Sequence, residues 1–201
     1  MYLGRKLIIV SIFFLICAGT ISGVSDLERI YYEFCPEIKK VDSYPDLYML
    51  ENNIYIFTKS HDETFKLVMI EQKGNQYLEK YCSSGSGDAY NLTPTFLKTN
   101  YKDDPIVIPA ECGTEYSWVR VFLLSGNSVE DIGLLNVGVE EIEGQIFSVV
   151  PYTKVIRKND SIVFSFTKDV DYDPGGQDLT ITKDKIFYLY ENGKLNEIKK
   201  D

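Results

Sequence analysis

The sequence has 201 residues, of which 44% are hydrophobic, and it carries a formal net charge of -9 at pH 7. This acidic balance lacks the positive footprint that nucleic acids and anionic membrane surfaces require, so we expect neither as a partner. It suits a basic protein, and equally a chain that uses charge only to stay soluble. The 15 Tyr and 11 Phe favour strands over helices.

The first 25 residues have the pattern of a secretory signal peptide. Arg5 and Lys6 precede the apolar run Leu7–Ile21, which contains or is followed by the small residues Gly19, Ser22, Gly23 and Ser25. At about 15 residues this run is shorter than the roughly 20 that cross a bilayer as a helix. We therefore predict cleavage after Ser25 and export to the periplasm or the medium; the alternatives are an uncleaved anchor and a buried helix. Residues 26–201 then form a single domain with no transmembrane span.

Cys17 offers a second form of export, a lipoprotein whose cysteine receives the lipid. The residues before it, Phe14 and Ile16, depart from the leucine and small residue that such a signal uses. An envelope-anchored lipoprotein therefore stays the alternative to a free exported protein.

A short helix is predicted next. Ser25 and Glu28 have the spacing of a capping box, and an apolar stripe follows before Pro36 ends the pattern. The stripe consists of Leu27, Ile30, Tyr31 and Phe34.

From Asp46 onward the pattern is that of strands joined by tight turns. Glu51-Asn52-Asn53 and Lys73-Gly74-Asn75 stand where hairpins need residues that tolerate a left-handed backbone. The strands predicted around these turns are Leu47–Leu50 with Ile54–Thr58, and Phe65–Glu71 with Gln76–Cys82.

Further strands are predicted in the second half of the chain. Tyr116–Leu124 and Val129–Val137 flank Ser125-Gly126-Asn127, while Pro151 limits pairing between Gln145–Val150 and Thr153–Arg157. Ser161–Thr167 alternates apolar and polar residues, as in a half-buried strand. Asn192-Gly193, the pair best suited to a type I′ turn, predicts a hairpin of Ile186–Glu191 and Lys194–Ile198.

On the order of twelve such strands predict a mainly β fold. We expect an antiparallel, hairpin-rich sandwich or barrel with one short N-terminal helix.

Export would permit a disulfide among the three cysteines that follow the signal peptide. Cys82 and Cys112 lie in the same central region and form the predicted pair, which leaves Cys35 as a free thiol. Three reduced, buried cysteines are the alternative.

The segment from Asp169 to Asp178 is the most suggestive chemical feature. Asp169, Asp171, Asp173 and Asp178 could converge on Ca²⁺ if the backbone curled around the ion. The segment departs from an EF-hand because Pro174 stands at the position of the invariant glycine. A solvated acidic turn without any cofactor is the favoured alternative.

A second acidic group comprises Glu130, Asp131, Glu140, Glu141 and Glu143. Two carboxylates in one cleft would suit a polysaccharide hydrolase, whereas carboxylates on the outer face of a sheet would look the same in sequence.

No catalytic motif is evident, and we expect an exported, non-enzymatic binding or inhibitory module with an acidic surface. Tyr44, Tyr48 and Tyr172 are its predicted binding residues, because tyrosine gives a large contact area at low entropic cost. A basic protein or a glycan is the expected partner. The alternatives are the hydrolase and a lipid-anchored structural protein of the envelope.

Overall fold

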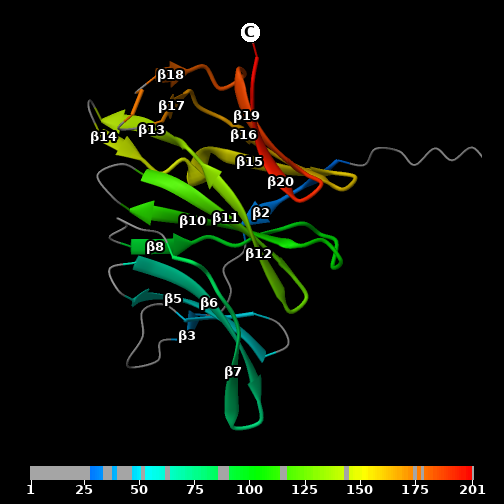
Figure 1. The fold of residues 1–201 in the computed structure, drawn as a ribbon. Helices are drawn as coiled ribbons and strands as arrows, with labels where there is room; N and C mark the ends of the chain where they lie inside the picture. Colours follow the sequence, from blue (N-terminus) through cyan, green and yellow to red (C-terminus); the bar gives the residue numbers. More distant parts are fainter. Residues whose placement is uncertain are drawn as a thin grey trace, which may run out of the picture.

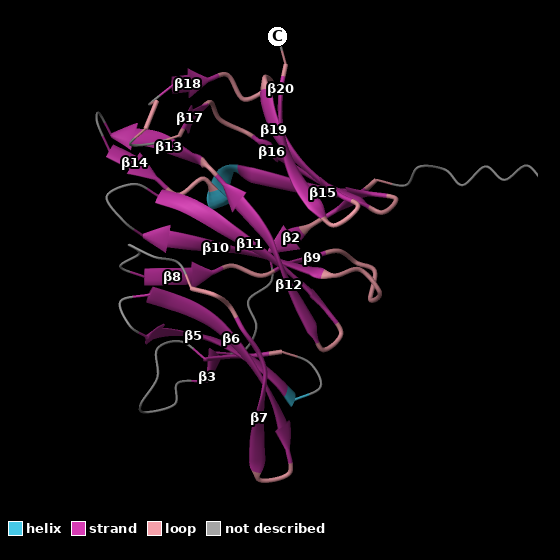
Figure 2. Cartoon of the chain, viewed as in Figure 1, coloured by secondary structure: helices cyan, strands magenta, loops and turns pink. Residues whose placement is uncertain are grey.

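The computed structural model describes residues 28–33, 38–39, 47–50, 53–61, 64–85, 91–113, 117–142, 145–173, 176–177 and 179–200. These ranges contain 20 β-strands and the 3-10 helix η2 (Val150–Tyr152), so the predicted mainly β character is confirmed (Figure 2). The predicted signal peptide (residues 1–25, which include Cys17), Cys35, Tyr44, Glu143 and Asp178 lie outside the described residues.

The strands form four sheets arranged in three layers (Figure 1). The first layer is the lower sheet, in the order β3-β4-β5-β6-β7. Its strands are β3 (Ile38–Lys39), β4 (Leu47–Met49), β5 (Ile54–His61), β6 (Thr64–Lys73) and β7 (Gln76–Cys82).

The middle sheet has the order β12-β11-β10-β9-β2, with β8 also paired to β10. Its strands are β2 (Tyr32–Glu33), β8 (Asn91–Pro94), β9 (Leu97–Lys98), β10 (Ile106–Gly113), β11 (Ser117–Ser125) and β12 (Ser128–Leu135).

The third layer holds the upper sheet and the side sheet. The upper sheet, in the order β1-β15-β16-β19-β20, contains β1 (Arg29–Ile30), β15 (Thr153–Lys158), β16 (Ser161–Phe166), β19 (Ile186–Glu191) and β20 (Lys194–Lys199). The side sheet, in the order β14-β13-β17-β18, contains β13 (Val137–Ile142), β14 (Gln145–Phe147), β17 (Val170–Tyr172) and β18 (Leu179–Ile181).

The predicted hairpins are confirmed as antiparallel pairs: β4 with β5, β6 with β7, β11 with β12, and β19 with β20. At the last turn Asn192 and Gly193 have φ values of 52° and 73°, the left-handed conformation that a type I′ turn requires. The predicted effect of Pro151 is also confirmed, because η2 separates β14 from β15 and the two belong to different sheets.

Two hydrophobic cores lie on opposite faces of the middle sheet. On β11, Val121 and Leu123 face the upper core, while Phe122 and Leu124 face the lower core. Successive side chains of a strand point to opposite faces, so burial of both faces requires the near-continuous apolar run that this strand shows. The expected two-layer sandwich is therefore a three-layer structure, and none of the four described sheets closes into a barrel.

The upper core joins the middle, upper and side sheets through Tyr31, Val107, Val119, Val121, Leu123, Ile132, Leu135, Val137, Val139, Val149, Val155, Ile162, Phe164, Phe166, Val170, Ile186 and Tyr188. The lower core joins the lower and middle sheets through Tyr48, Leu50, Ile54, Ile56, Leu67, Met69, Leu92, Phe96, Ile108, Ala110, Cys112, Phe122, Leu124 and Val129.

The predicted N-terminal helix is wrong for the residues that the structure describes. Arg29–Ile30 pairs with β15, and Tyr32–Glu33 pairs with β9. Tyr31 between them is buried, while Ile30 is 58% exposed, so the alternation is that of a strand rather than of a helical stripe. We call Arg29–Glu33 the N-terminal strap, because it joins the upper sheet to the middle sheet.

Candidate ligand-binding pocket

The described part of the predicted calcium segment includes the short strand β17. Asp171 lies on β17 and is buried; its carboxylate accepts hydrogen bonds from the Glu140 backbone N–H and the Thr180 hydroxyl, each at 3.0 Å. Asp169 accepts one from the Lys183 backbone N–H at 3.0 Å. These carboxylates therefore stabilise the connection of β17 to β13 and β18.

Asp173 is bonded in a similar local way, since it accepts hydrogen bonds from the Asn136 side chain at 3.0 Å and the Gln177 backbone N–H at 3.2 Å. Within the described residues, no three His, Cys, Asp or Glu side chains gather as a metal site would need. Each of the three described carboxylates instead accepts hydrogen bonds from groups of its own, so they do not converge on a common point.

Cys82 and Cys112 are not joined to each other by the predicted disulfide in the structure. Cys112 is fully buried in the lower core, with its Sγ 3.8 Å from the carbonyl oxygen of Ala110. The Sγ of Cys82 on β7 lies 3.8 Å from the carbonyl oxygen of Ser83. Each sulfur thus contacts the backbone beside it.

Among the predicted binding tyrosines, Tyr48 is not exposed at the surface. It is buried in the lower core, with its ring 4.9 Å from that of Phe96 between centroids. Tyr172 is half-buried, and the Lys199 ammonium lies 3.3 Å from its ring centroid. The alternation on β4 placed Tyr48 on the face that meets the middle sheet.

The second acidic group is spread over partners of its own. Glu130 accepts a hydrogen bond from Tyr190 at 2.8 Å, and burial together with this carboxylate raises the pKa of Tyr190 to about 12. Asp131 pairs with Arg120, and Glu141 accepts a hydrogen bond from the Tyr152 hydroxyl. These carboxylates therefore contact tyrosine hydroxyls and a guanidinium and do not pair with each other.

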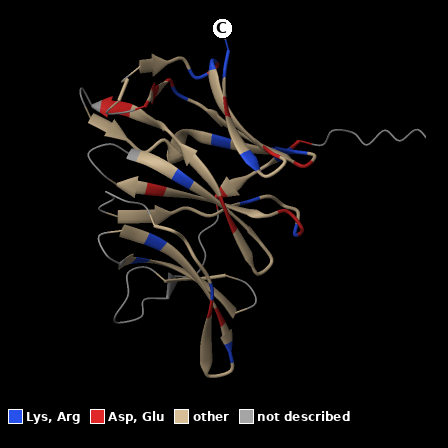
Figure 3. Cartoon of the chain, viewed as in Figure 1, with Lys and Arg blue, Asp and Glu red and all other residues tan. Residues whose placement is uncertain are grey.

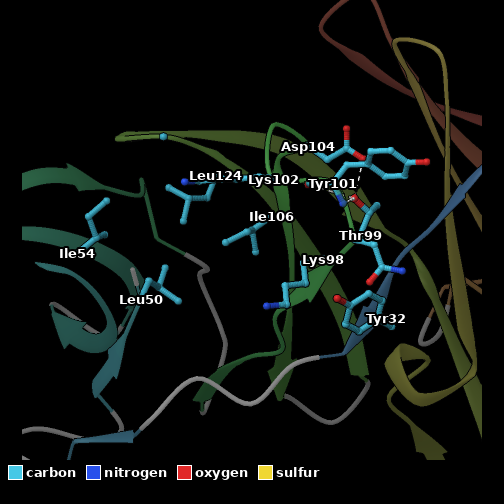
Figure 4. Close-up of a pocket in the computed structure, with 12 residues that line it drawn as sticks. Tyr32, Leu50, Ile54, Lys98, Thr99, Tyr101, Lys102, Asp104, Ile106 and Leu124 are labelled. Carbon is cyan, nitrogen blue, oxygen red and sulfur yellow. Dashed lines mark hydrogen bonds between the residues drawn. The ribbon is translucent and has the colours of Figure 1, made fainter. Parts of the chain in front are cut away.

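A pocket of about 550 Å³ opens between the lower sheet and the middle sheet (Figure 4). This volume falls within the range of small-ligand sites. Its lining comes from the edge of the lower core, from the N-terminal strap, and from the loop between β9 and β10 with the residues beside it: Tyr32, Leu50, Ile54, Lys98, Thr99, Asn100, Tyr101, Lys102, Asp104, Ile106, Leu124 and Gly126.

The pocket has an aliphatic back and a polar, aromatic front. Leu50, Ile54 and Leu124 are buried and belong to the lower core. At the front, Tyr32 is 42% exposed, and Lys98 beside it directs its ammonium end toward the side of Leu50 (Figure 4). The site therefore offers apolar contact and a positive charge together.

The N-terminal strap places Tyr32 in the pocket. Tyr32 pairs with Lys98 in the β2–β9 ladder, and the Tyr31 N–H donates to the Val155 carbonyl at 3.0 Å. Because Tyr31 points into the upper core, the alternation of the strand turns Tyr32 outward.

Asp104 is the acidic residue of the lining, and its charge is compensated inside the protein. Its side chain is 2% exposed, with Arg29 at 2.5 Å and Arg157 at 3.5 Å. The Thr99 hydroxyl donates to it at 2.7 Å, and the Arg29 guanidinium stacks over Tyr101 at 4.4 Å. This network fixes the loop between β9 and β10.

The described lining of the pocket also contains two basic residues, Lys98 and Lys102. Basic and acidic residues stand close together in the loop between β9 and β10 (Figure 3).

Sequence reasoning missed this pocket, because Tyr32, Lys98 and Leu124 come from distant parts of the chain and no motif joins them. In the part of the chain that the structure describes, no helix has the length and apolar character to cross a membrane. Comparison with protein-family models, curated proteins and solved structures finds no match to this chain.

Proposed function

We propose that the chain is an exported, non-enzymatic binding module whose ligand occupies the pocket between the lower and middle sheets. The observation that carries the proposal is the pocket itself, which has an aliphatic back, an exposed tyrosine and hydrogen-bonding groups at its mouth. Concave sites of this size and composition are where proteins usually bind small ligands.

A glycan fits this pocket better than a basic protein does. The exposed ring of Tyr32 offers a face for the apolar side of a sugar, and Asn100 and Lys102 supply donors around it. Lys98 and Lys102 would repel the cations of a basic partner.

Chemical-shift mapping tests the site. An oligosaccharide titrated into ¹⁵N-labelled protein should shift the amide signals of residues 98–102 and 124–126 and leave those of the β19–β20 hairpin unchanged. Tyr32→Ala should weaken the binding, while Tyr77→Ala, which truncates a 60% exposed tyrosine of β7, should not. Shifts confined to another surface would refute the proposed site.

Export has a separate test. The intact mass of the protein purified from its native source should equal that of residues 26–201. A mass that begins at Cys17 with added lipid would support the envelope-anchored alternative, and a full-length mass would refute cleavage.

A further inference from the structure

We infer that two copies of the chain dimerise through the outer face of the upper sheet, about a two-fold axis that runs along β16. This interface goes beyond the proposed binding function, and its residues do not line the ligand pocket.

The first observation is an apolar band on the outer face of the upper sheet. The inner face of this sheet contributes Val155 and Ile162 to the upper core. Because successive residues of a strand point to opposite faces, Ile156, Val163 and Leu189 point away from that core. An antiparallel sheet that faces water usually carries polar residues at such positions. The band consists of Ile30, Ile156, Val163, Phe187, Leu189 and Ile198, and none of the six belongs to or packs against either described core.

The band crosses the sheet in register. Ile30 pairs with Ile156, and Ile156 pairs with Val163. Val163 pairs in turn with Leu189, so one apolar row crosses β1, β15, β16 and β19. Ile30 is 58% exposed, and the other three are half-buried. The upper sheet is an outer layer of the molecule (Figure 1), and a contiguous apolar surface in such a place marks an interaction site.

The second observation is the order of charges in the neighbouring row of the same face, two residues further along each strand. Lys158 on β15 pairs with Ser161 on β16, and Glu191 on β19 pairs with Lys194 on β20. Glu28 directly precedes β1. From β1 to β20 this row therefore reads negative, positive, neutral, negative, positive. Charges at equal distances on the two sides of β16 are thus opposite in sign.

This order of charges is complementary to itself. A two-fold axis along β16 places β15 of one copy over β19 of the other and sets each row over its own counterpart. Lys158 then meets Glu191 of the second copy, and Glu28 meets Lys194 of the second copy. Within the described part of the chain, neither Lys158 nor Glu191 is already held in another ion pair.

A second copy of the chain therefore suits this face better than a partner of one charge sign does. An isologous contact requires a surface that complements itself, as this row does. The apolar rows of the two copies would cover each other, and sheets whose strands run within about 30° of each other pack in this manner. A uniformly basic or acidic partner would be repelled by half of the charges in the row.

The size of the face sets the expected strength of the dimer. Five strands spaced ~4.8 Å apart, each with about six residues in the face, give roughly 500 Å² of sheet on each copy. A total of roughly 1,000 Å² lies at the lower limit of specific interfaces. We therefore expect a dimer that dissociates on dilution.

Sedimentation velocity of the mature chain tests the dimer. Between about 5 and about 500 μM, the average mass should rise from that of one chain toward that of two. Val163→Lys should keep the chain monomeric throughout this range, because two ammonium groups would meet at the axis. Unchanged far-UV circular dichroism and an unchanged urea midpoint would show that this variant is folded.

Exchanged charges test the two-fold arrangement. Lys158→Glu and Glu191→Lys should each weaken the dimer about tenfold or more, because each creates two like-charge contacts across the axis. The double variant restores both pairs and should return to within about threefold of the original dissociation constant. Lys73→Glu makes the same charge change at an exposed residue of the lower sheet, and it should change the dissociation constant by less than about threefold.

The outcomes are distinct. A chain that stays monomeric up to about 500 μM would overturn the inference and leave the proposed ligand pocket unaffected. Co-sedimentation of that monomer with vesicles of anionic lipid would assign the band to a membrane surface instead. A dimer that Val163→Lys does not weaken would place the interface elsewhere and overturn the inference. Weakening by both single charge variants without rescue by the double variant would overturn the axis along β16 and the inference with it.

Discussion

Phe122→Ala tests whether the middle sheet couples the two cores. The side chain is fully buried in the lower core, with its ring 6.5 Å from that of Tyr81 in an edge-on contact. A buried Phe side chain removes about 150–200 Å² from water, and at ~25 cal/mol per Å² this contributes about 4 kcal/mol. Measured Phe→Ala losses of about 3–5 kcal/mol agree with that figure.

The loss should act on the whole molecule, because the preceding residue, Val121, belongs to the upper core. With a urea slope of ~2 kcal/mol per M, the unfolding midpoint should fall by about 2 M. The fluorescence of Trp118, which packs against the lower core, reports that core, and far-UV circular dichroism reports all sheets. The two transitions should coincide and move together.

Two further variants guard this measurement. Phe122→Leu keeps most of the volume and should cost about 1–2 kcal/mol, so that it stays folded if the alanine variant does not. Leu179→Thr, at a 48% exposed position, should change stability by less than about 0.5 kcal/mol. Two separate transitions in the Phe122→Ala protein would refute the coupling. In that case the fluorescence transition would move to lower urea, while a second transition in the dichroism would stay unshifted.

Three other substitutions test single features. Tyr31→Phe should change stability little at pH 7, because the buried hydroxyl has no hydrogen bond of good geometry in the described structure, although the Arg157 guanidinium lies near it. Burial raises the pKa of Tyr31 from 10.0 to about 12, so stability that is present below pH 10 should be lost as the pH rises toward 12. Between pH 7 and pH 11 the urea midpoint of the Phe variant should therefore fall less than that of the unmodified protein. Gly193→Ala should lower the free energy of unfolding, measured by thermal unfolding, by about 1 kcal/mol. Gly193→Asn should lower it less, because asparagine tolerates the φ of 73°. Equal losses in the two variants would contradict this reason. Arg120→Lys should speed amide hydrogen exchange at residues 83–85, because the guanidinium donates to the Gly85 carbonyl at 2.8 Å while it pairs with Asp131. Unchanged exchange would show that this contact does not hold the loop.

The sequence predicted well what is decided locally. The turn at Asn192-Gly193 and the alternation of Ser161–Thr167 depend on residues within a few positions of each other, and both appear in the structure as expected. The apolar run of β11, which only Arg120 interrupts, also contained the signal for burial on both faces. A single strand, however, does not reveal which two sheets will cover it.

Contacts between distant segments explain the errors. The strap residues satisfy a helical spacing, but β15 and β9 supply backbone partners that favour the extended form. The alternation of side chains around Tyr48 shows that one face of its strand is buried, but it does not show which face. The aspartates from Asp169 to Asp173 suggested a curled loop, but Asp171 lies in β17, which pairs with β13 and β18, and each carboxylate has hydrogen-bond donors of its own.

The pocket could not be predicted, because its lining is assembled by the topology alone. Lys98 faces Tyr32 only after β9 has paired with β2, and Leu124 reaches the same space from the end of β11. Each of these residues is unremarkable in its own stretch of sequence.

The N-terminal strap has a consequence for the order of folding. Arg29 pairs in register with Arg157, so a chain that is synthesised or exported from its N-terminus must carry Arg29–Ile30 unpaired until β15 has emerged, although Tyr32–Glu33 can pair with β9 earlier. Non-local pairing of this kind slows folding and leaves a strand edge exposed in the meantime. The first described residues of the chain should therefore be among the last to dock, and the strap that carries Tyr32 should be fixed at both ends only at that final step.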